Sequence, residues 1–239
     1  MHRAFLPFHP FRRLAPLCAA FVLIAAAPHQ RPPLPADVAL HEAAPDSFLA
    51  SFSTTKGTFL MKARRVWSPL GVDRLYHLVD SGYFDGLVIY RVGPTKSVKG
   101  SRVVQFGQAD DPSVIRAWAA DTILDERVVR PHRRGTVNFA RGGPNSRSVE
   151  VAITTNAAAP LDTVNYLGVV GFPSVAEVER GMEVLDHLEG RYGNAPIESD
   201  SMAILGRAWV DRRFPGLDAI RTARITKVWN GATKHRSAH

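Results

Sequence analysis

The stretch WSPLGVDRLYHLVDSGYFDGLVIYRV, residues 67–92, carries the clearest signal of the fold. Ser68 and Pro69 suit the N-cap and first turn of a helix, and Gly82 suits its end. Leu87 to Val92 then has the apolar composition of a strand. The stretch therefore predicts a helix packed on a sheet, with an apolar helical face made of Val72, Leu75, Tyr76 and Val79.

Short strand-like segments lie on both sides of this stretch. Residues 48–53 and 58–63 alternate between apolar and polar side chains and are separated by Thr54-Thr55-Lys56-Gly57, which predicts a β-hairpin. Further strands are predicted at residues 87–92, 102–106, 136–140, 149–154, 166–170 and 221–229.

A second helix is predicted from Ser174 to Gly190. Ser174 and Glu177 have the spacing of a capping box, and apolar residues at helical spacing follow them. Residues 107–134 are predicted to be irregular, with one helical turn around Val114 to Trp118. No internal repeat is visible in the sequence.

These elements predict a mainly β fold. About eight strands occur without alternating helices, which favours a closed eight-stranded antiparallel barrel capped by two α-helices. We expect this domain to span residues 47–229, with a Pro-rich linker at 28–46 and a flexible basic tail at 230–239.

The N-terminus, residues 1–27, has the layout of a secretory signal peptide. Three arginines and no acidic residue accompany an apolar run from Leu14 to Ala27. Pro16 interrupts this run, which is shorter than the about 20 apolar residues that span a bilayer. We expect a periplasmic or secreted protein with no stable membrane insertion after cleavage; an uncleaved anchor is the alternative.

The composition excludes several classes of protein. With 239 residues, of which 45% are hydrophobic, the chain can bury a full core, which excludes intrinsic disorder. The single cysteine, Cys18, excludes an intramolecular disulfide and a thiolate zinc site. Beyond residue 27 there are 27 basic and 22 acidic residues, scattered along the chain, so no nucleic-acid partner is expected. The nine histidines form no HExxH motif, and neither a metal nor a cofactor is expected.

The order of these segments resembles that of the cyclophilin-type peptidyl-prolyl cis-trans isomerases. Residues 67–92 are similar to the family's proline-started helix, Gly-Tyr/Phe-Asp-Gly turn and strand ending in an aromatic residue and an arginine. VVQFG at 103–107 and GTVNFARGGPNS at 135–146 resemble the family's glutamine-containing strand and its Gly-Pro-Asn-Ser segment. The ending GRAWVDRRFPGLDAIRTARI, from Gly206, resembles an exported bacterial branch of the family.

The resemblance implies a catalytic arginine and a glutamine that orients it, which are Arg91 and Gln105 in this chain. Such an isomerase holds proline in an apolar pocket and places a donor against the proline nitrogen, so that amide resonance weakens most in the transition state. Taken alone, Arg91 suits a surface ion pair and Gln105 a solvent-facing position on a strand. Substrate-binding positions implied by the resemblance are Val103, Ala140, Arg141, Ala152 and Leu161.

Several positions depart from the family pattern. Arg102 and Ala152 stand where the pocket usually has phenylalanines, and Pro160 stands where a tryptophan often occurs. The usual Gly-Ser-Gln run is Ser148-Val149-Glu150, and a pocket histidine or aromatic residue falls at Val164 or Asn165. Candidate replacement rings are Phe106, Phe139 and Tyr166.

Two functions remain open at this point. The first is an isomerase of reduced activity that acts on proline-containing polypeptides and assists the folding of exported proteins. The second is a cyclophilin-like module that only binds peptides or proteins. A monomer is expected in both cases. The departures at Arg102, Ala152 and Pro160 favour the second function.

Overall fold

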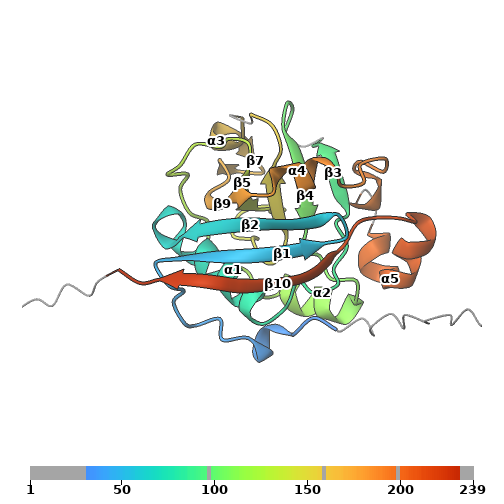
Figure 1. Cartoon of the computed structure of the whole chain (residues 1–239), viewed down its shortest axis with the longest axis horizontal. Helices are drawn as coiled ribbons and strands as arrows, with labels where there is room; N and C mark the ends of the chain where they lie inside the picture. Colours follow the sequence, from blue (N-terminus) through green and yellow to red (C-terminus); the bar gives the residue numbers. More distant parts are fainter. Residues whose placement is uncertain (1–30, 96–97, 158–159, 198–199, 232–239) are drawn as a thin grey trace, which may run out of the picture.

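The computed structural model describes residues 31–95, 98–157, 160–197 and 200–231 (Figure 1). The predicted signal peptide at residues 1–27 lies outside the described residues, as does the tail from residue 232 onward. No helix within the described part of the chain is both long and apolar enough to cross a membrane.

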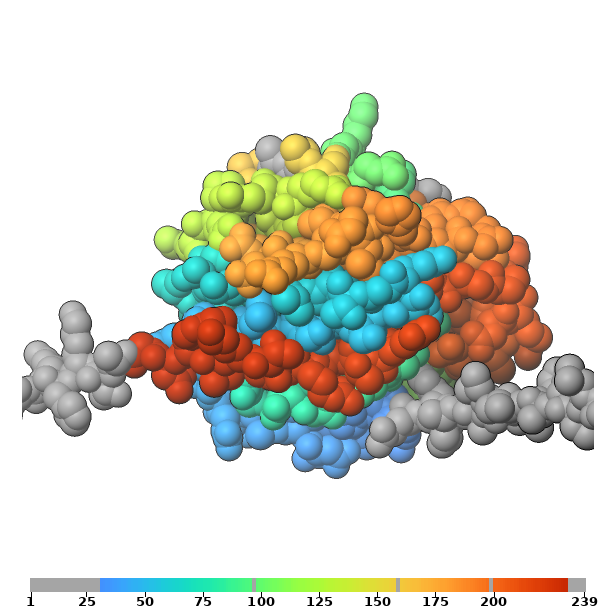
Figure 2. All heavy atoms as spheres, viewed as in Figure 1, coloured from blue at the N-terminus to red at the C-terminus, as the bar shows by residue number. Residues whose placement is uncertain are grey.

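A curled antiparallel sheet forms the body of the molecule. Its eight strands follow the order β10-β1-β2-β9-β5-β6-β4-β3. The bounds are β1 Ser47–Thr54, β2 Gly57–Arg64, β3 Arg91–Pro94, β4 Arg102–Phe106, β5 Thr136–Phe139, β6 Val151–Thr154, β9 Ser174–Arg180 and β10 Ile220–Trp229. Figure 2 shows β10, β1 and β2 as adjacent bands across one face of the molecule.

The sheet forms a half-barrel, so the prediction of a closed barrel is wrong. Its outer strands are β10 and β3. The segment before β3 meets the start of β10 through a few backbone hydrogen bonds, which include those of Gly86 and Leu87 with Ile220, and through the isolated bridge between Val88 and Ala219. β3 itself has only four residues and begins after this point in the chain. It therefore does not pair along the ten residues of β10, and the barrel stays open.

The predicted hairpin is confirmed by β1 and β2, which pair in register from Ser47–Arg64 to Thr54–Gly57. Alternate side chains of both strands are completely buried, as expected for strands with one face on a core. Phe52 and Phe59 are cross-strand partners, and their rings stack with centroids 5.1 Å apart. The pair therefore joins the hairpin to the centre of the core.

The first predicted helix is confirmed by α1, Pro69–Asp80, which packs against β10 and β9. Val72, Leu75 and Val79 are fully buried, whereas Tyr76 lies at the edge of the core and packs its ring on Phe48. Gly82 has a φ of 73°, the left-handed conformation that ends many helices.

The second predicted helix is wrong over residues 174–180, which form strand β9 between β2 and β5. The two residues with capping-box spacing contact Arg130 instead: Ser174 donates to its carbonyl oxygen, and Glu177 forms an ion pair with its guanidinium. Only α4, Met182–Asp186, is helical. Pairing with two neighbouring strands overrides the local helical pattern.

Two further helices differ from the prediction. α2, Pro112–Ala119, is longer than the single predicted turn, and the Asp111 carboxylate caps it by accepting from the backbone N–H groups of Ser113 and Val114. α5, Ser201–Arg213, was not predicted; Gly206, with a φ of 68°, kinks it into two helical pieces. The short elements are α3 Pro160–Thr163, β7 Asn165–Tyr166, β8 Val169–Val170, and the 3-10 helices Pro35–Asp37, Arg65–Trp67 and Ala195–Ile197.

The described part of the Pro-rich segment lies along the domain. Leu34, Val38 and Leu40 pack against the main core, and Trp118 of α2 donates from its indole nitrogen to the Pro33 carbonyl oxygen over 2.9 Å. The boundaries of the linker and the domain stay predictions.

Candidate functional site

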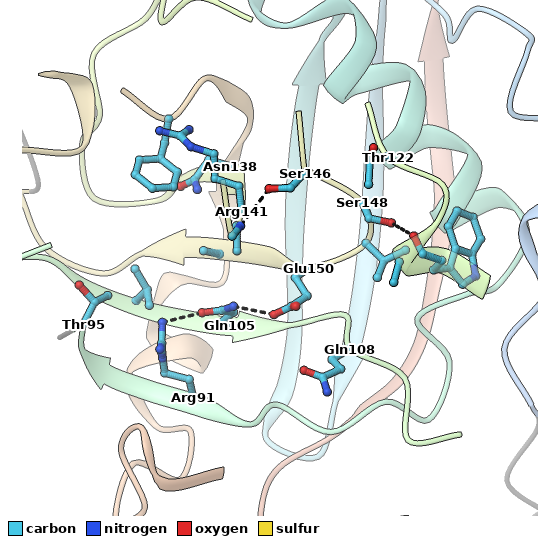
Figure 3. A pocket seen from close by; sticks show the side chains of 18 of the residues that line it. Arg91, Thr95, Gln105, Gln108, Thr122, Asn138, Arg141, Ser146, Ser148 and Glu150 are labelled. Carbon is cyan, nitrogen blue, oxygen red and sulfur yellow. Dashed lines mark hydrogen bonds between the residues drawn. The ribbon is translucent and has the colours of Figure 1, made fainter. Parts of the chain in front are cut away.

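A cavity of about 540 Å³ lies over β4, β5 and β6, between β3 and α2 (Figure 3). All seven site residues predicted from the sequence line this one cavity: Arg91, Val103, Gln105, Ala140, Arg141, Ala152 and Leu161. Positions that are up to 70 residues apart in sequence therefore come together through the pairing of short strands.

The register of the sheet positions the polar centre of the cavity. Gln105 is the cross-strand partner of Arg91 on one side and of Ala152 on the other. Directly opposite residues in an antiparallel sheet share a face, so their side chains meet in the same cavity. Arg91 donates from Nη1 to Gln105 Oε1 over 2.8 Å.

The hydrogen-bond network continues from Gln105 to Glu150, which the sequence analysis did not propose as a site residue. Gln105 donates from Nε2 to Glu150 Oε2 over 2.9 Å, and the Tyr90 hydroxyl donates to the same oxygen over 2.6 Å. Burial raises the pKa of Tyr90 well above its usual 10.0, and the nearby Glu150 charge adds to this shift. The phenol therefore stays protonated as a donor. Figure 3 shows Arg91, Gln105 and Glu150 linked in a row.

Gln105 is buried, with 5% of its surface exposed, so the alternative interpretation of Gln105 as a solvent-facing strand residue is wrong. The alternation of β4 explains this position: Val103 and Gln105 line the cavity, while Val104 and Phe106 belong to the main core. Arg102, one of the departures from the family pattern, is exposed.

An apolar cluster forms one wall of the cavity. Val98, Leu161 and Phe172 are its buried members, and Tyr166 packs on them with its ring 5.7 Å from that of Phe172. Tyr166, one of the candidate replacement rings, thus lines the cavity, whereas Phe106 and Phe139 are fully buried in the main core.

Phe172 is the aromatic residue that sequence reasoning missed. The expected positions were Val164, which packs at the edge of the apolar cluster, and Asn165, which is exposed. Phe172 is held there because its N–H donates to the Leu161 carbonyl oxygen over 2.8 Å. The glycine before it, Gly171, was the signal in the sequence for a tightly packed turn at this point. A Cβ at Gly171 would lie 2.4 Å from the Asp162 carbonyl oxygen, so the turn requires glycine.

Arg141 lies on the ring of Phe172, with its guanidinium carbon 4.0 Å from the ring centroid. It donates from Nη2 to the Val169 carbonyl oxygen over 2.9 Å. Burial lowers the pKa of Arg141, and the nearby charge of Asp125 opposes that shift. The side chain therefore joins the apolar wall to the short β7–β8 hairpin.

The opposite end of the cavity is built by α2 and by the segments before β6. Its lining residues there, which sequence reasoning missed, include Gln108, Ile115, Trp118, Thr122, Ser148 and Val149. Gln108, Ile115, Trp118 and Thr122 fall in residues 107–134, which were predicted to be mostly irregular, so the sequence offered no pattern that aimed these four side chains at Arg91. Within the described residues, no group of His, Cys, Asp and Glu side chains is arranged to hold a metal ion.

The arrangement is suited to holding a small apolar ring beside a fixed cation. The Arg91 guanidinium is always charged and offers several donors in one plane, and the apolar wall lines the same cavity. None of the seven predicted residues is a covalent nucleophile, so the site can act by binding and by hydrogen bonding.

Comparisons with known proteins agree with this fold. The family model described as cyclophilin type peptidyl-prolyl cis-trans isomerase/CLD matches residues 49–205. A crystal structure of a cyclophilin type peptidyl-prolyl cis-trans isomerase from Cryptosporidium parvum aligns with a TM-score of 0.52 and 17% identity, over 76% of this chain and 98% of that one. A second structure of that protein, obtained in the presence of the dipeptide Ala-Pro, aligns with a TM-score of 0.51 and 16% identity, over 75% and 99% of the two chains.

Proposed function

Since the chain belongs to the cyclophilin-type peptidyl-prolyl cis-trans isomerase family, we propose that it accelerates cis-trans rotation of the peptide bond before proline in polypeptides. The observation that supports this most is the hydrogen bond of 2.8 Å between Arg91 and Gln105 at the centre of the cavity, beside an apolar wall. The proposed partners are proline-containing polypeptides, and the Cryptosporidium parvum relative was crystallised in the presence of a proline dipeptide.

The reaction needs no bond to be broken. Resonance in the amide gives a rotation barrier of about 18 to 20 kcal/mol, so unaided isomerisation takes tens of seconds or more. As the bond twists, the proline nitrogen becomes pyramidal and gains a lone pair. A donor directed at that nitrogen stabilises the twisted state more than the planar one, which lowers the barrier. We assign that donor to Arg91.

The other site residues act by holding the substrate. In this proposal Gln105 orients Arg91, and Val103, Ala152, Leu161 and Phe172 form the pocket for the proline ring. Ala140 and Arg141, which line the cavity beside them, contact the neighbouring peptide backbone. The pocket lacks a ring at Ala152 but has the ring of Phe172, so we propose reduced rather than absent catalysis.

The second candidate is a module that binds peptides without useful turnover. The exposed Arg102 and the small Ala152 favour it, because both stand where the family pattern has a pocket phenylalanine. We further propose that the protein is exported through its first 27 residues, and the layout of that segment supports export. In this proposal it acts as a monomer and assists the folding of exported proteins.

An isomerisation assay on a tetrapeptide with one X-Pro bond separates the two candidates. We expect the wild-type protein to accelerate the reaction and Arg91→Ala to lose about a hundredfold of that acceleration, since one donor to a transition state is removed. Arg221→Ala, an exposed arginine on β10, is the matched control and keeps the wild-type rate. Tight peptide binding by a wild-type protein that gives no acceleration would support the binding module instead.

A further inference from the structure

We infer that Glu150 is a positioning residue for the proposed isomerase site: its carboxylate sets the orientation of the Gln105 side-chain amide and, through it, of the Arg91 guanidinium. This inference rests on the proposed function. It assigns a role to a residue that stands where the family pattern has a glutamine and whose side chain lines the same cavity as Arg91.

The chemistry of the three groups allows only one arrangement. A guanidinium can only donate hydrogen bonds, and an ionised carboxylate can only accept them. Gln105 lies between the two, so its amide oxygen must face Arg91 and its amide nitrogen must face Glu150. The two hydrogen bonds have this orientation: Arg91 Nη1 lies 2.8 Å from Gln105 Oε1, and Gln105 Nε2 lies 2.9 Å from Glu150 Oε2.

Tyr90 holds the carboxylate in place. Its ring is completely buried, and its hydroxyl donates to Glu150 Oε2 over 2.6 Å, the same oxygen that accepts from Gln105. The backbone is held as well, because the Ala140 N–H donates to the Glu150 carbonyl oxygen over 2.8 Å. Glu150 therefore has a fixed position from which it can orient the amide.

Burial makes the orientation of Gln105 costly to change. The residue is only 5% exposed, so water is poorly placed to replace a lost partner. Turning the amide by 180° would set its NH₂ group against the Arg91 guanidinium and its oxygen against the carboxylate. A donor would then face a donor, an acceptor would face an acceptor, and both hydrogen bonds would be lost. A neutral glutamine at position 150, the family's residue, can accept or donate and so removes this constraint.

Two substitutions test the inference in the isomerisation assay. Glu150→Gln is expected to lower kcat about threefold to tenfold, and Glu150→Ala about tenfold or more, with KM within about twofold of wild type. Tyr90→Phe should lower kcat by a smaller factor, since Glu150 keeps its bond to Gln105. The matched control is Glu177→Gln, the same change on β9 outside the cavity, which should keep the wild-type kcat.

A second measurement does not depend on turnover. In ¹⁵N-labelled wild-type protein, the Gln105 side-chain NH₂ should give one sharp pair of ¹H–¹⁵N cross-peaks, and the Arg91 Nε–H should give one sharp cross-peak. Both should shift or broaden in Glu150→Gln and Glu150→Ala but not in Glu177→Gln.

The outcomes of the two measurements separate the inference from the proposed function. If the wild-type protein shows no isomerisation, the proposed function fails, and the resonances alone decide the inference. Unchanged Gln105 and Arg91 resonances in both Glu150 variants overturn it. A kcat within twofold of wild type in Glu150→Ala, or a loss carried entirely by KM, also overturns it.

Discussion

Phe172 determines how well the proposed pocket can hold a proline ring. It is 6% exposed, its ring is 5.7 Å from that of Tyr166, and the Arg141 guanidinium lies on it. An aromatic ring in this wall replaces part of the surface that Ala152 does not provide. The residue is thus the main reason to expect measurable catalysis despite the departures from the family pattern.

Removal of this ring should weaken catalysis. Phe172→Ala is expected to cost about 1 to 3 kcal/mol of transition-state binding, or roughly one to two orders of magnitude in kcat/KM of the tetrapeptide assay. Phe172→Leu, which keeps an apolar side chain, should lose less. Thermal unfolding of both variants checks that the fold is kept. Full activity in a folded Phe172→Ala protein would remove this residue from the pocket.

At the scale of elements, the boundary between β9 and α4 depends on one glycine. Gly181 has a φ of 87°, and a Cβ there would lie 2.6 Å from Phe59 Cα on β2. Only a residue without a side chain allows the chain to leave the sheet and enter α4 at that distance. The change from β9 to α4 therefore depends on the close approach of Gly181 to β2, which is distant in sequence.

Gly181→Ala should destabilise the protein by about 2 to 4 kcal/mol, from left-handed backbone strain and from overpacking against β2. Chemical denaturation measures this free energy of unfolding. Gly143→Ala is the control, because Gly143 has no atom within 4 Å of the position of an added Cβ and no positive φ. The two variants should differ by at least about 1.5 kcal/mol; equal stability would show that β2 and β9 adjust without cost.

The elements also show where local patterns mislead. The β1–β2 hairpin and α1 follow from alternation, turn residues and a helical face, and both are confirmed. Residues 174–180 have an equally local helical pattern but lie between two strands, where backbone pairing outweighs it. α5 was missed because Gly206 interrupts the helix with a non-helical backbone. The Arg207 N–H that follows donates to the carbonyl oxygen of Asp110, which is distant in sequence, over 3.0 Å.

At the scale of the whole molecule, buried tyrosines link stability to alkaline pH. Tyr83 and Tyr90 are completely buried, and burial raises the pKa of both phenols above the usual 10.0. In the unfolded chain the same phenols ionise at about 10. Above that pH the unfolded state binds fewer protons than the folded state, so the free energy of unfolding falls as the pH rises.

Denaturation at pH 8, 10 and 11 tests this linkage. The stabilisation from the two neutral phenols should be fully present at pH 8 and should decrease between pH 10 and 11. Tyr83→Phe removes one of the two titrating groups, together with its hydrogen bond to the Gly107 carbonyl oxygen, and should make the decrease shallower. An equal slope in wild type and variant would show that Tyr83 ionises in the folded protein as it does in the unfolded chain.

The sequence alone determined the mainly β class, the helix α1 and the seven positions that line one cavity, because each depends on local periodicity or on a recognisable order of motifs. Only the tertiary structure decided that the sheet stays open, that Phe172 completes the apolar wall and that Glu150 lies against Gln105. The physical reason is that strand register and loop packing bring together side chains from different segments, and no segment contains the information about its neighbours in space.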